Sequence, residues 1–341
     1  MSGTSLDGLD IALCDFHFDE KWTFKILEAE TITYDESLRA NLSGLSKGTA
    51  LELVKGHTKF GRFCGKSVAD FIRRKKVKVD FVASHGHTIF HQPSAGFSTQ
   101  IGDGASMSVE AGLPVVCDFR STDVALGGQG APLVPLGDRL LFAEYSHCLN
   151  LGGIANISFD ADEKRMAFDI SACNILFNHL AQEKNLAYDK DGEIAASGKV
   201  HFGLLKELNS ETYYDKSFPK SLGREDVDLI LNKYFILNKH SLSIEDLMAT
   251  AVEHVAQQIG RAAVSGKMLV TGGGAFNSVL VSGIKKHSGA TLVIPDPLLL
   301  NYKEALIFAF LGLKRWRSEV NCLGTVTGAS RDSIGGAIYF G

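Results

Sequence analysis

One order of predicted elements occurs twice in this chain of 341 residues, and the repetition limits the folds open to it. Each copy starts with a glycine-rich hairpin and continues with helix, strand, helix and strand. The first copy is predicted at strands 11–16 and 24–33, helix 49–74, strand 79–84, helix 105–111 and strand 115–119. The second is predicted at strands 148–151, 154–159 and 165–170, helices 175–184 and 244–262, strand 268–271, helix 278–286 and strand 291–294. A repeated α/β unit predicts two similar lobes whose glycine loops converge in a cleft.

Composition and charge exclude several classes of partner. A net charge of −4 and a pI near 6.3 provide no field that would attract nucleic acid or an anionic membrane. We therefore expect a small-molecule ligand. Six cysteines without a C-x-x-C spacing argue against zinc and for a reducing cytosol. The longest apolar run, 305–313, has about half the length that spans a bilayer, so we expect a cytoplasmic protein without a membrane partner.

Three glycine clusters have the composition of phosphate-binding loops. Glycine removes the Cβ that blocks close approach, so backbone N–H groups and hydroxyls can surround an anion. The clusters are Gly3, Thr4, Ser5 and Gly8 in the first copy, Gly152 and Gly153 in the second, and Gly272, Gly273 and Gly274 further on. One such loop alone is more typical of a simple hairpin, but three together favour a nucleotide ligand.

Two other nucleotide motifs are missing from the sequence. It contains no G-x-x-x-x-G-K-[ST], and no G-x-G-x-x-G that follows a strand and opens a helix with an acidic residue further on. A P-loop enzyme and a dinucleotide-binding enzyme are therefore not expected.

A series of motifs runs in order across nearly the whole chain. It comprises M-S-G-T-S-L-D-G-L-D at 1–10, S-H-G-H-T at 84–88, D-F-R-S-T-D-V-A-L-G-G-Q-G-A-P-L-V-P at 118–135, and the segments 150–158, 219–224, 272–277, 304–305 and 326–329. This series resembles the anhydro-N-acetylmuramic acid kinase family, in the superfamily of sugar kinases, Hsp70 and actin. The resemblance implies a duplicated, two-lobed actin-like (ribonuclease H-like) fold with a central nucleotide cleft. The lobes are then expected at 1–140 and 141–341.

The resemblance also implies a reaction. Water opens the anhydro bridge of 1,6-anhydro-N-acetylmuramic acid at C1 while O6 takes the γ-phosphoryl group of ATP, which gives N-acetylmuramic acid 6-phosphate during peptidoglycan recycling. This chemistry needs a base for the water, Mg²⁺ and hydrogen-bond donors around the triphosphate, and groups that hold the sugar. Family members of this kind are also expected to be homodimers.

The family pattern assigns these tasks to particular positions. The catalytic base is Asp169, which the sequence places at the end of a strand before a helix, where the helix N-terminus would keep it ionised. Magnesium is assigned to Asp7. The nucleotide is assigned to Gly3, Thr4, Ser5, Leu6, Asp7, Gly8, Leu9, Asp10, Gly152, Gly153, Asn156, Gly272, Gly273, Gly274 and Asn277. The sugar is assigned to His85, Asp118, Arg120 and Glu304, with Arg120 holding the lactyl carboxylate.

Each assignment has a structural alternative. Asp169 would then only cap the following helix, and Asp7 would only stabilise its own turn. His85 would be an unbonded loop histidine, and Arg120 would pair with the neighbouring acids Asp118 and Asp123. Glu304 would be the first-turn acid of an apolar helix.

Three features depart from the family pattern. The family follows its catalytic Asp with a small residue and G-P-G-N, whereas Asp169 is followed by I-S-A-C-N. The usual S-H-G-Q-T reads S-H-G-H-T and introduces the titratable His87. The sequence also begins inside its first motif, so we expect the leading strand of the first lobe to be missing.

The altered segment 170–173 leaves two other functions open. One is a non-catalytic or chaperone-like ATP-binding protein of the same superfamily. The other is a kinase of a related anhydrohexose that lacks the lactyl group.

Overall fold

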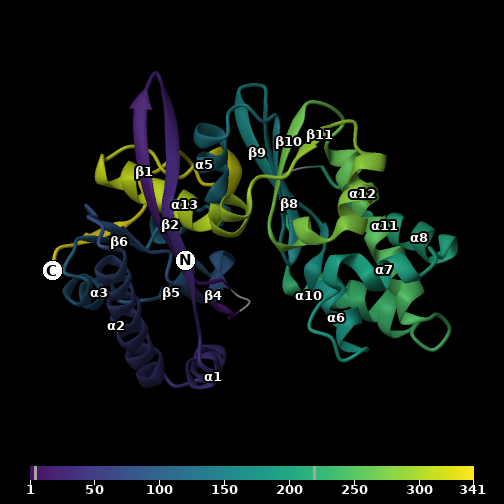
Figure 1. Cartoon of the computed structure of the whole chain (residues 1–341), viewed down its shortest axis with the longest axis horizontal. Coiled ribbons are helices and arrows are strands. Elements are labelled where there is room, and N and C mark those ends of the chain that lie inside the picture. The colour runs from purple at the N-terminus through teal and green to yellow at the C-terminus, as the bar shows by residue number, and fades with distance from the viewer. Residues whose placement is uncertain (4–5, 218–219) are drawn as a thin grey trace. The chain divides into compact units, whose positions relative to one another are not determined.

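The computed structural model describes residues 1–3, 6–217 and 220–341 and is shown in Figure 1. Its contacts form two compact units, Met1–Leu141 with Tyr302–Gly341, and Phe142–Asn301. The expected division near residue 140 lies next to the boundary at Leu141. The segment Tyr302–Gly341, which the expected ranges put in the second lobe, has its contacts in the first unit. No helix in the described ranges has the length and apolarity to cross a bilayer.

The second unit is built on a mixed sheet of five strands in the order β11-β10-β7-β8-β9. They are β7 (His147–Leu151), β8 (Ile154–Ala161), β9 (Lys164–Ala172), β10 (Lys267–Thr271) and β11 (Thr291–Val293). β8 runs antiparallel to both β7 and β9, whereas β10 runs parallel to β7 and β11. The first strand of the unit therefore lies at the centre of the sheet. This arrangement confirms the predicted α/β class and the ribonuclease H-like order of elements.

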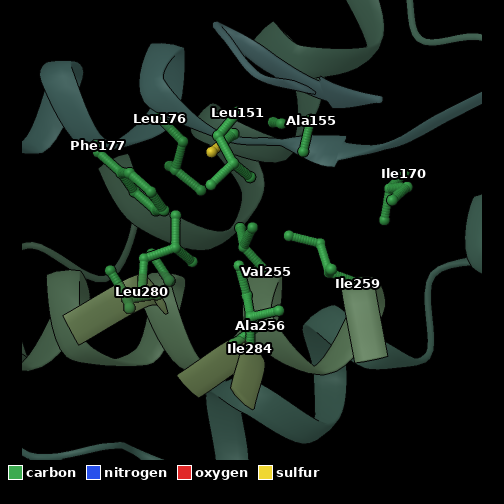
Figure 2. Close-up of a cluster of buried hydrophobic side chains, with 14 of the residues drawn as sticks. Leu151, Ala155, Ile170, Leu176, Phe177, Val255, Ala256, Ile259, Leu280 and Ile284 are labelled. Atoms are coloured by element: carbon green, nitrogen blue, oxygen red, sulfur yellow. The ribbon is translucent and has the colours of Figure 1, made fainter. Parts of the chain in front are cut away.

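Helices pack their apolar residues against this sheet. α6 (Asn174–Gln182), α11 (Ile244–Ala262) and α12 (Ser278–His287) match the predicted helices. Figure 2 shows Leu151 and Ala155 of the sheet in one buried cluster with Val255 and Ile259 of α11. Helices α11 and α12 approach closely at Gly260, where an added Cβ would lie 2.5 Å from the carbonyl oxygen of His287.

The polar insertion between the predicted helices forms short helices. These are η3 (Lys190–Gly192), α7 (Glu193–Ser197), α8 (Phe202–Asn209), α9 (Thr212–Asp215), α10 (Arg224–Ile230) and the π-helix η4 (Leu231–Ile236). Buried leucines of α8, among them Leu204 and Leu208, join the core that is built around α11. The insertion is thus part of the folded unit.

The first unit has its strands in separate sheets. β1 (Gly8–Asp19) and β2 (Lys21–Thr33) form a long two-stranded ribbon, which stands out in Figure 1. β3 (Val82–Ala83) pairs parallel with β6 (Val115–Cys117), and β12 (Ala337–Tyr339) pairs antiparallel with β6. Among the described residues no strand joins β1 to β3. The order of hairpin, helix, strand, helix and strand is nevertheless the one predicted.

The first unit also contains several helices. They are α1 (Glu36–Gly44), the 3₁₀ turn η1 (Leu45–Lys47), α2 (Ala50–Lys75), α3 (Gly104–Ala111), α4 (Ser121–Ala125), α5 (Val134–Leu141) and α14 (Gly324–Thr327), with α13 (Pro297–Trp316) entering from the second unit. Of these helices, α3 packs on β6 and α5 on β2. A capping box of Thr49 and Glu52 starts α2. Two glycines of α2 allow close packing on α3, since a Cβ at Gly65 would lie 2.5 Å from the carbonyl oxygen of Met107.

The structure contains one hairpin that was not predicted. β4 (His87–Gln92) and β5 (Phe97–Ile101) pair antiparallel and are joined by the 3₁₀ turn η2 (Pro93–Ala95) and Gly96. Gly96 adopts a φ of 83°, a conformation that glycine tolerates best. The Pro and Gly between two short extended runs were the available sequence signal.

The core of the second unit yields a stability prediction. Leu247 of α11 is 0% exposed, whereas Leu229 of α10 is 67% exposed. We expect Leu247→Ala to lower the free energy of unfolding by about 2–5 kcal/mol, because it loses apolar burial and leaves a cavity. Leu229→Ala, the matched control, should change it by less than about 0.5 kcal/mol. Urea unfolding followed by circular dichroism measures both, and equal losses would contradict this description of the core.

Candidate active site

Three polar residues form a row across neighbouring strands of the second unit. Asn150 of β7 pairs with Asn156 of β8, which pairs with Asp169 of β9. Residues that lie directly opposite in a sheet have their side chains on the same face. Since Leu151 and Ala155 point into the core cluster of Figure 2, their neighbours Asn150 and Asn156 lie on the opposite face.

The second and third glycine clusters meet at one edge of this sheet. Gly152 and Gly153 connect β7 to β8, and Gly272 follows β10, which runs parallel to β7. Gly272 has a φ of 84°, and a Cβ there would lie 2.5 Å from Oδ1 of Asn150. The sheet thus brings both clusters next to Asn150. Ligands of α/β proteins bind at such carboxyl ends of parallel strands.

The altered segment after Asp169 is held by the glycine turn. The backbone N–H of Cys173 donates to the carbonyl of Gly153 at 2.9 Å, and that of Asn174 donates to the carbonyl of Gly152 at 3.2 Å. The Asn174 side chain donates to the carbonyl of Leu151 at 2.9 Å. The N-terminus of α6 is therefore joined to the β7–β8 turn.

The predicted surroundings of Asp169 are wrong. β9 continues to Ala172, and the N-cap residue of α6 is Cys173, so Asp169 neither caps this helix nor lies at its N-terminus. Its Oδ2 accepts instead from the backbone N–H of Leu222 at 3.0 Å. Burial raises the pKa of Asp169 above its ordinary value, and the Leu222 N–H opposes this rise only in part.

The insertion provides further contacts to Asp169. The Tyr213 hydroxyl donates to the backbone carbonyl of Asp169 at 2.6 Å, and the Asp169 N–H donates to the carbonyl of Lys220 at 3.1 Å. Next to Tyr213, the Tyr214 hydroxyl lies 2.8 Å from Nε2 of His254 on α11. Burial lowers the pKa of His254 to about 3, which keeps this imidazole neutral.

The predictions did not include Tyr213, Lys220 or Leu222 as residues around Asp169. Only the match of 219–224 to the family's motif hinted at this segment. Backbone contacts across an insertion leave no periodic pattern that a sequence reading would detect.

Asn277, predicted at the nucleotide, caps a helix. Its Oδ1 accepts from the backbone N–H of Leu280 at 3.0 Å, at the start of α12. Gly273 and Gly274 form the 3₁₀ turn η5 (Gly273–Phe276) just before it. A ligand contact of Asn277 would therefore use its NH₂ group or its backbone.

In the first unit, two of the predicted sugar residues contact each other. Nδ1 of His85 lies 3.0 Å from the carbonyl of Gly86, so it carries the proton and donates. Nε2 is then an acceptor, and it receives a hydrogen bond from Nη2 of Arg120 at 2.8 Å. Burial and the adjacent guanidinium lower the pKa of His85 well below its ordinary value. His85 is thus a neutral, bonded histidine and not the unbonded loop residue of the structural alternative.

Arg120 does not pair with its sequence neighbours. Asp118 accepts from the Ser121 hydroxyl, and Asp123 accepts from the N–H of Gly130 and the hydroxyl of Thr327. Within the described residues, the buried Nε of Arg120 has no hydrogen-bond partner. Burial lowers the pKa of Arg120 to about 10, and the charge of Glu304 opposes this fall. Arg120 therefore keeps a donor available for an anion.

Glu304 is not the first-turn acid of its helix. α13 begins at Pro297, about two turns earlier. The side chain of Glu304 is solvent-accessible, but surrounding protein raises the pKa of its carboxyl. The charges of Lys303, the amino terminus and Arg120 act in the opposite direction. The structure thus brings His85, Arg120 and Glu304 together in the first unit, whereas the Asp118 side chain is exposed and bonded to Ser121.

The first glycine loop is only partly described, because Thr4 and Ser5 lie outside the described residues. The Leu6 N–H donates to the carbonyl of Gly3 at 3.4 Å. A Cβ at Gly8 would lie 2.6 Å from the carbonyl oxygen of Ile32, so only glycine fits here beside β2. Leu9, the second residue of β1, is buried in the hydrophobic core of the first unit.

The acidic residues of this loop differ in their surroundings. Asp7 is exposed, while Oδ1 of Asp10 accepts from the Thr31 hydroxyl at 2.6 Å. In the described part of the chain, no three His, Cys, Asp or Glu side chains cluster as a metal site. A loop carboxylate still suits Mg²⁺, which binds one or two carboxylates together with phosphate oxygens and water.

His87, the departure from the family motif, anchors the same loop. It is 4% exposed, and its Nδ1 lies 2.9 Å from the Ser2 hydroxyl oxygen, which accepts from the Tyr34 hydroxyl at 2.7 Å. Burial lowers the pKa of His87. This neutral imidazole fixes Ser2 at the start of the first glycine loop.

The raised pKa of Asp169 predicts how stability depends on pH. The folded state holds this proton more tightly than the unfolded chain, so stability decreases as pH rises above the ordinary pKa of 3.8. Asp169→Asn removes the buried charge and keeps an oxygen that accepts from Leu222. We therefore expect a thermal midpoint at pH 7 equal to or above that of the wild type, and a difference that shrinks below pH 4. Marked destabilisation by Asp169→Asn at pH 7 would show that the ionised carboxylate stabilises the fold.

Comparison with known proteins finds a family model and curated relatives that match nearly the whole chain and share one described activity. The family model for anhydro-N-acetylmuramic acid kinase matches residues 1–341. The anhydro-N-acetylmuramic acid kinase of Sulfurimonas denitrificans is 33% identical, with 99% of this chain and 98% of that protein aligned. The corresponding kinase of Pseudomonas syringae is 34% identical over 99% of this chain and 97% of its own length. A glucokinase structure from Streptomyces griseus aligns over 88% of this chain and 98% of its own at 11% identity, and its TM-score of 0.35 is too low to carry an argument. The full-length match and the close relatives show that the chain belongs to the anhydro-N-acetylmuramic acid kinase family.

Proposed function

We propose that this protein uses ATP and water to convert 1,6-anhydro-N-acetylmuramic acid to N-acetylmuramic acid 6-phosphate in peptidoglycan recycling. The observation that carries the proposal is the position of the Asp169 carboxylate. It is largely desolvated, it accepts a hydrogen bond from the Leu222 N–H, and Asp169 lies opposite Asn156 in the sheet. The match of the family model over the whole chain supports the choice of substrate.

In this proposal Asp169 is the general base. It takes a proton from the water that attacks C1, the bond between C1 and the bridging oxygen breaks, and that oxygen becomes O6 and accepts the γ-phosphoryl group. A carboxylate with a raised pKa is a stronger base than an ordinary one, provided that it is ionised at neutral pH. The contacts of Tyr213 and Lys220 with the Asp169 backbone hold the carboxylate in one position.

The glycine clusters and the asparagines are assigned to ATP. Gly152, Gly153 and Asn156 bind the phosphates on the second unit, and Gly272, Gly273, Gly274 and Asn277 bind the adenosine side. The close approach of Gly272 to Asn150 supports this assignment, because the loop has no side chain that would keep a ligand at a distance. The described parts of the first loop, Gly3 and 6–10, are assigned to the phosphates as well, together with Thr4 and Ser5.

Magnesium is assigned to Asp7, and the exposure of its carboxylate supports this role. When bound, Mg²⁺ neutralises negative charge that develops on the phosphoryl oxygens. Asp10 acts differently in this proposal, because its Oδ1 is engaged by Thr31 and holds the loop to β2.

Arg120 is assigned to the lactyl carboxylate of the sugar. Its Nε–H is buried without a partner, and Nη2 still has one hydrogen beyond the one that it gives to His85. These two N–H groups are adjacent on the guanidinium and suit a bidentate pair with a carboxylate. His85 positions Arg120, while Glu304 and Asp118 are assigned to the sugar hydroxyls.

Two further properties belong to the same proposal. We place the enzyme in the cytoplasm as a homodimer, as the family resemblance implies. Six cysteines that are all free thiols suit a reducing compartment.

The base is tested by Asp169→Asn. We expect ATP binding to persist and sugar-dependent ADP release to fall at least about 10²-fold, since general-base catalysis contributes that much. Coupled ADP assays and ATP titration measure both. Asp162→Asn, in the exposed turn between β8 and β9, is the matched control and should keep full activity. Unchanged turnover by Asp169→Asn would remove Asp169 from the mechanism, and a wild type that binds ATP without sugar stimulation would favour the non-catalytic alternative.

The lactyl contact is tested by Arg120→Gln with two sugars. We expect the KM for anhydro-N-acetylmuramic acid to rise about 10–100-fold, because a charged hydrogen-bonding partner is lost. Turnover of anhydro-N-acetylglucosamine, which has no lactyl group, should change little. Equal effects on both sugars would mean that Arg120 does not recognise the carboxylate. A wild type that prefers the sugar without the lactyl group would favour the related-anhydrohexose alternative.

A further inference from the structure

A chain of hydrogen bonds leads from the surface of the second unit to the surroundings of Asp169. It begins at Glu253 on α11 and passes through Gln257 and Asn209 to His254, and from there to Tyr214. His254 is 1% exposed. Its Nδ1 lies 2.8 Å from Oδ1 of Asn209, and its Nε2 lies 2.8 Å from the Tyr214 hydroxyl oxygen. No step of the proposed reaction uses these groups.

The acceptor at the start of the chain fixes the direction of every hydrogen bond in it. Burial acts to raise the pKa of Glu253, but its hydrogen bonds and neighbouring cations lower this pKa below its ordinary value, so the carboxylate can only accept. Gln257 therefore donates its NH₂ group to Glu253, and its carbonyl oxygen accepts from Asn209 at 2.8 Å. Oδ1 of Asn209 is then an acceptor, which receives the Nδ1–H of His254. Nε2 of His254 is left to accept from the Tyr214 hydroxyl.

Tyr214 connects this chain to α9, the short helix that contacts the backbone of Asp169. None of the four residues of α9 is buried. The ammonium of Lys220 donates to the carbonyls of Tyr213 at 3.1 Å and of Tyr214 at 3.2 Å. The Tyr213 hydroxyl donates to the Asp169 carbonyl, and the Lys220 carbonyl accepts from the Asp169 N–H. The position of Tyr214 thus affects both backbone groups of Asp169.

The strand that carries Asp169 has a β-bulge directly after it. Asp169 lies opposite Asn156 in the pairing of β9 with β8. Ser171 lies opposite the next residue of β8, Ala155, which Figure 2 shows in the buried cluster. Ile170 is therefore the extra residue of the bulge, a feature that redirects side chains next to functional sites.

The bulge brings Ser171 to the end of the hydrogen-bonded chain. Its side chain is buried, and its hydroxyl donates to the carbonyl of Ala172 at 3.1 Å. The same hydroxyl oxygen lies 3.4 Å from the Tyr214 hydroxyl oxygen and 3.5 Å from Nε2 of His254. The altered segment after Asp169 therefore packs against the pair of Tyr214 and His254.

A polar chain is not required to fill this part of the core. Replacing both partners of a buried hydrogen bond by apolar groups of the same shape is often nearly neutral for stability. The hydrogen bond instead adds a fixed direction and distance between the groups that it joins. Between Tyr214 and His254, it fixes where α9 lies relative to the core helix α11.

We propose that His254 is a positioning residue for Asp169. Its Nε2 holds the Tyr214 hydroxyl, Tyr214 holds α9, and α9 holds the backbone of Asp169 through Tyr213. The inference rests on the proposed role of Asp169 as the general base, and it adds a residue that acts through others and not on the reacting atoms.

The test replaces both partners at once, in the double variant Tyr214→Phe with His254→Leu. This variant leaves neither partner of the pair alone, and Oδ1 of Asn209 still accepts from Gln258 at 2.6 Å. We therefore expect a thermal midpoint close to that of the wild type. We expect kcat to fall about 10–100-fold because the base is displaced. The KM values for ATP and the sugar should change little, since the groups assigned to binding are untouched.

Two single variants separate positioning from stability. His254→Gln keeps an acceptor near the position of Nε2, so it should retain most of the wild-type kcat. Leu247→Ala lies on the same helix but outside the hydrogen-bonded chain. It should lower the thermal midpoint and keep the wild-type kcat at temperatures where the protein is folded.

Hydrogen exchange, read by mass spectrometry, tests the same inference without turnover. The N–H of Asp169 is bonded to Lys220, and the N–H of Leu222 is bonded to the Asp169 carboxylate. The double variant should speed exchange in the peptides that contain these amides by about tenfold, whereas His254→Gln should not. Unchanged kcat or unchanged exchange in the double variant, or an equal loss of kcat in Leu247→Ala, would overturn the inference. A wild type without sugar-dependent turnover would contradict the proposed reaction instead, and the exchange rates would still decide whether His254 positions Asp169.

Discussion

The pairing of β7 with both β8 and β10 is the constraint on which the candidate site of the second unit depends. Through β8 it aligns Asn150 and Asn156 with Asp169 of β9, and through β10 it brings Gly272 against Asn150. The leucines of β7 are buried on the other face of the same strand and hold it in register. One strand thus couples the position of Asp169 to that of two glycine clusters.

Burial has different effects on the charged groups of the two units. At Asp169 it raises the pKa of a carboxylate with one backbone donor, which suits a base. At His85 it lowers the pKa of an imidazole, which remains a neutral acceptor for Arg120. The guanidinium in turn keeps an unpartnered Nε. Asp169 in the second unit and Arg120 in the first are therefore largely desolvated polar groups with incomplete hydrogen bonding. Such groups cost folding stability and are typical of functional sites.

The sequence predicted the elements of the second unit and their order along the chain, because apolar periodicity and glycine turns are local signals. It predicted that the strand ends at residue 170 and that a helix N-terminus lies beside Asp169, whereas β9 continues to Ala172, because the end of β9 depends on its pairing with β8. It also missed Tyr213 and Leu222, whose contacts to Asp169 come from an insertion far along the chain. The role of His87 depends on Ser2 and Tyr34, which are also far from it in sequence.

In the proposed reaction, one protein both adds water at C1 and phosphorylates O6. The most direct measurement is mass spectrometry of the product formed from anhydro-N-acetylmuramic acid, ATP and Mg²⁺ in water enriched in oxygen-18. We expect N-acetylmuramic acid 6-phosphate that carries one oxygen-18 at C1. A phosphorylated sugar without the added water, or a water-opened sugar without phosphate, would contradict it.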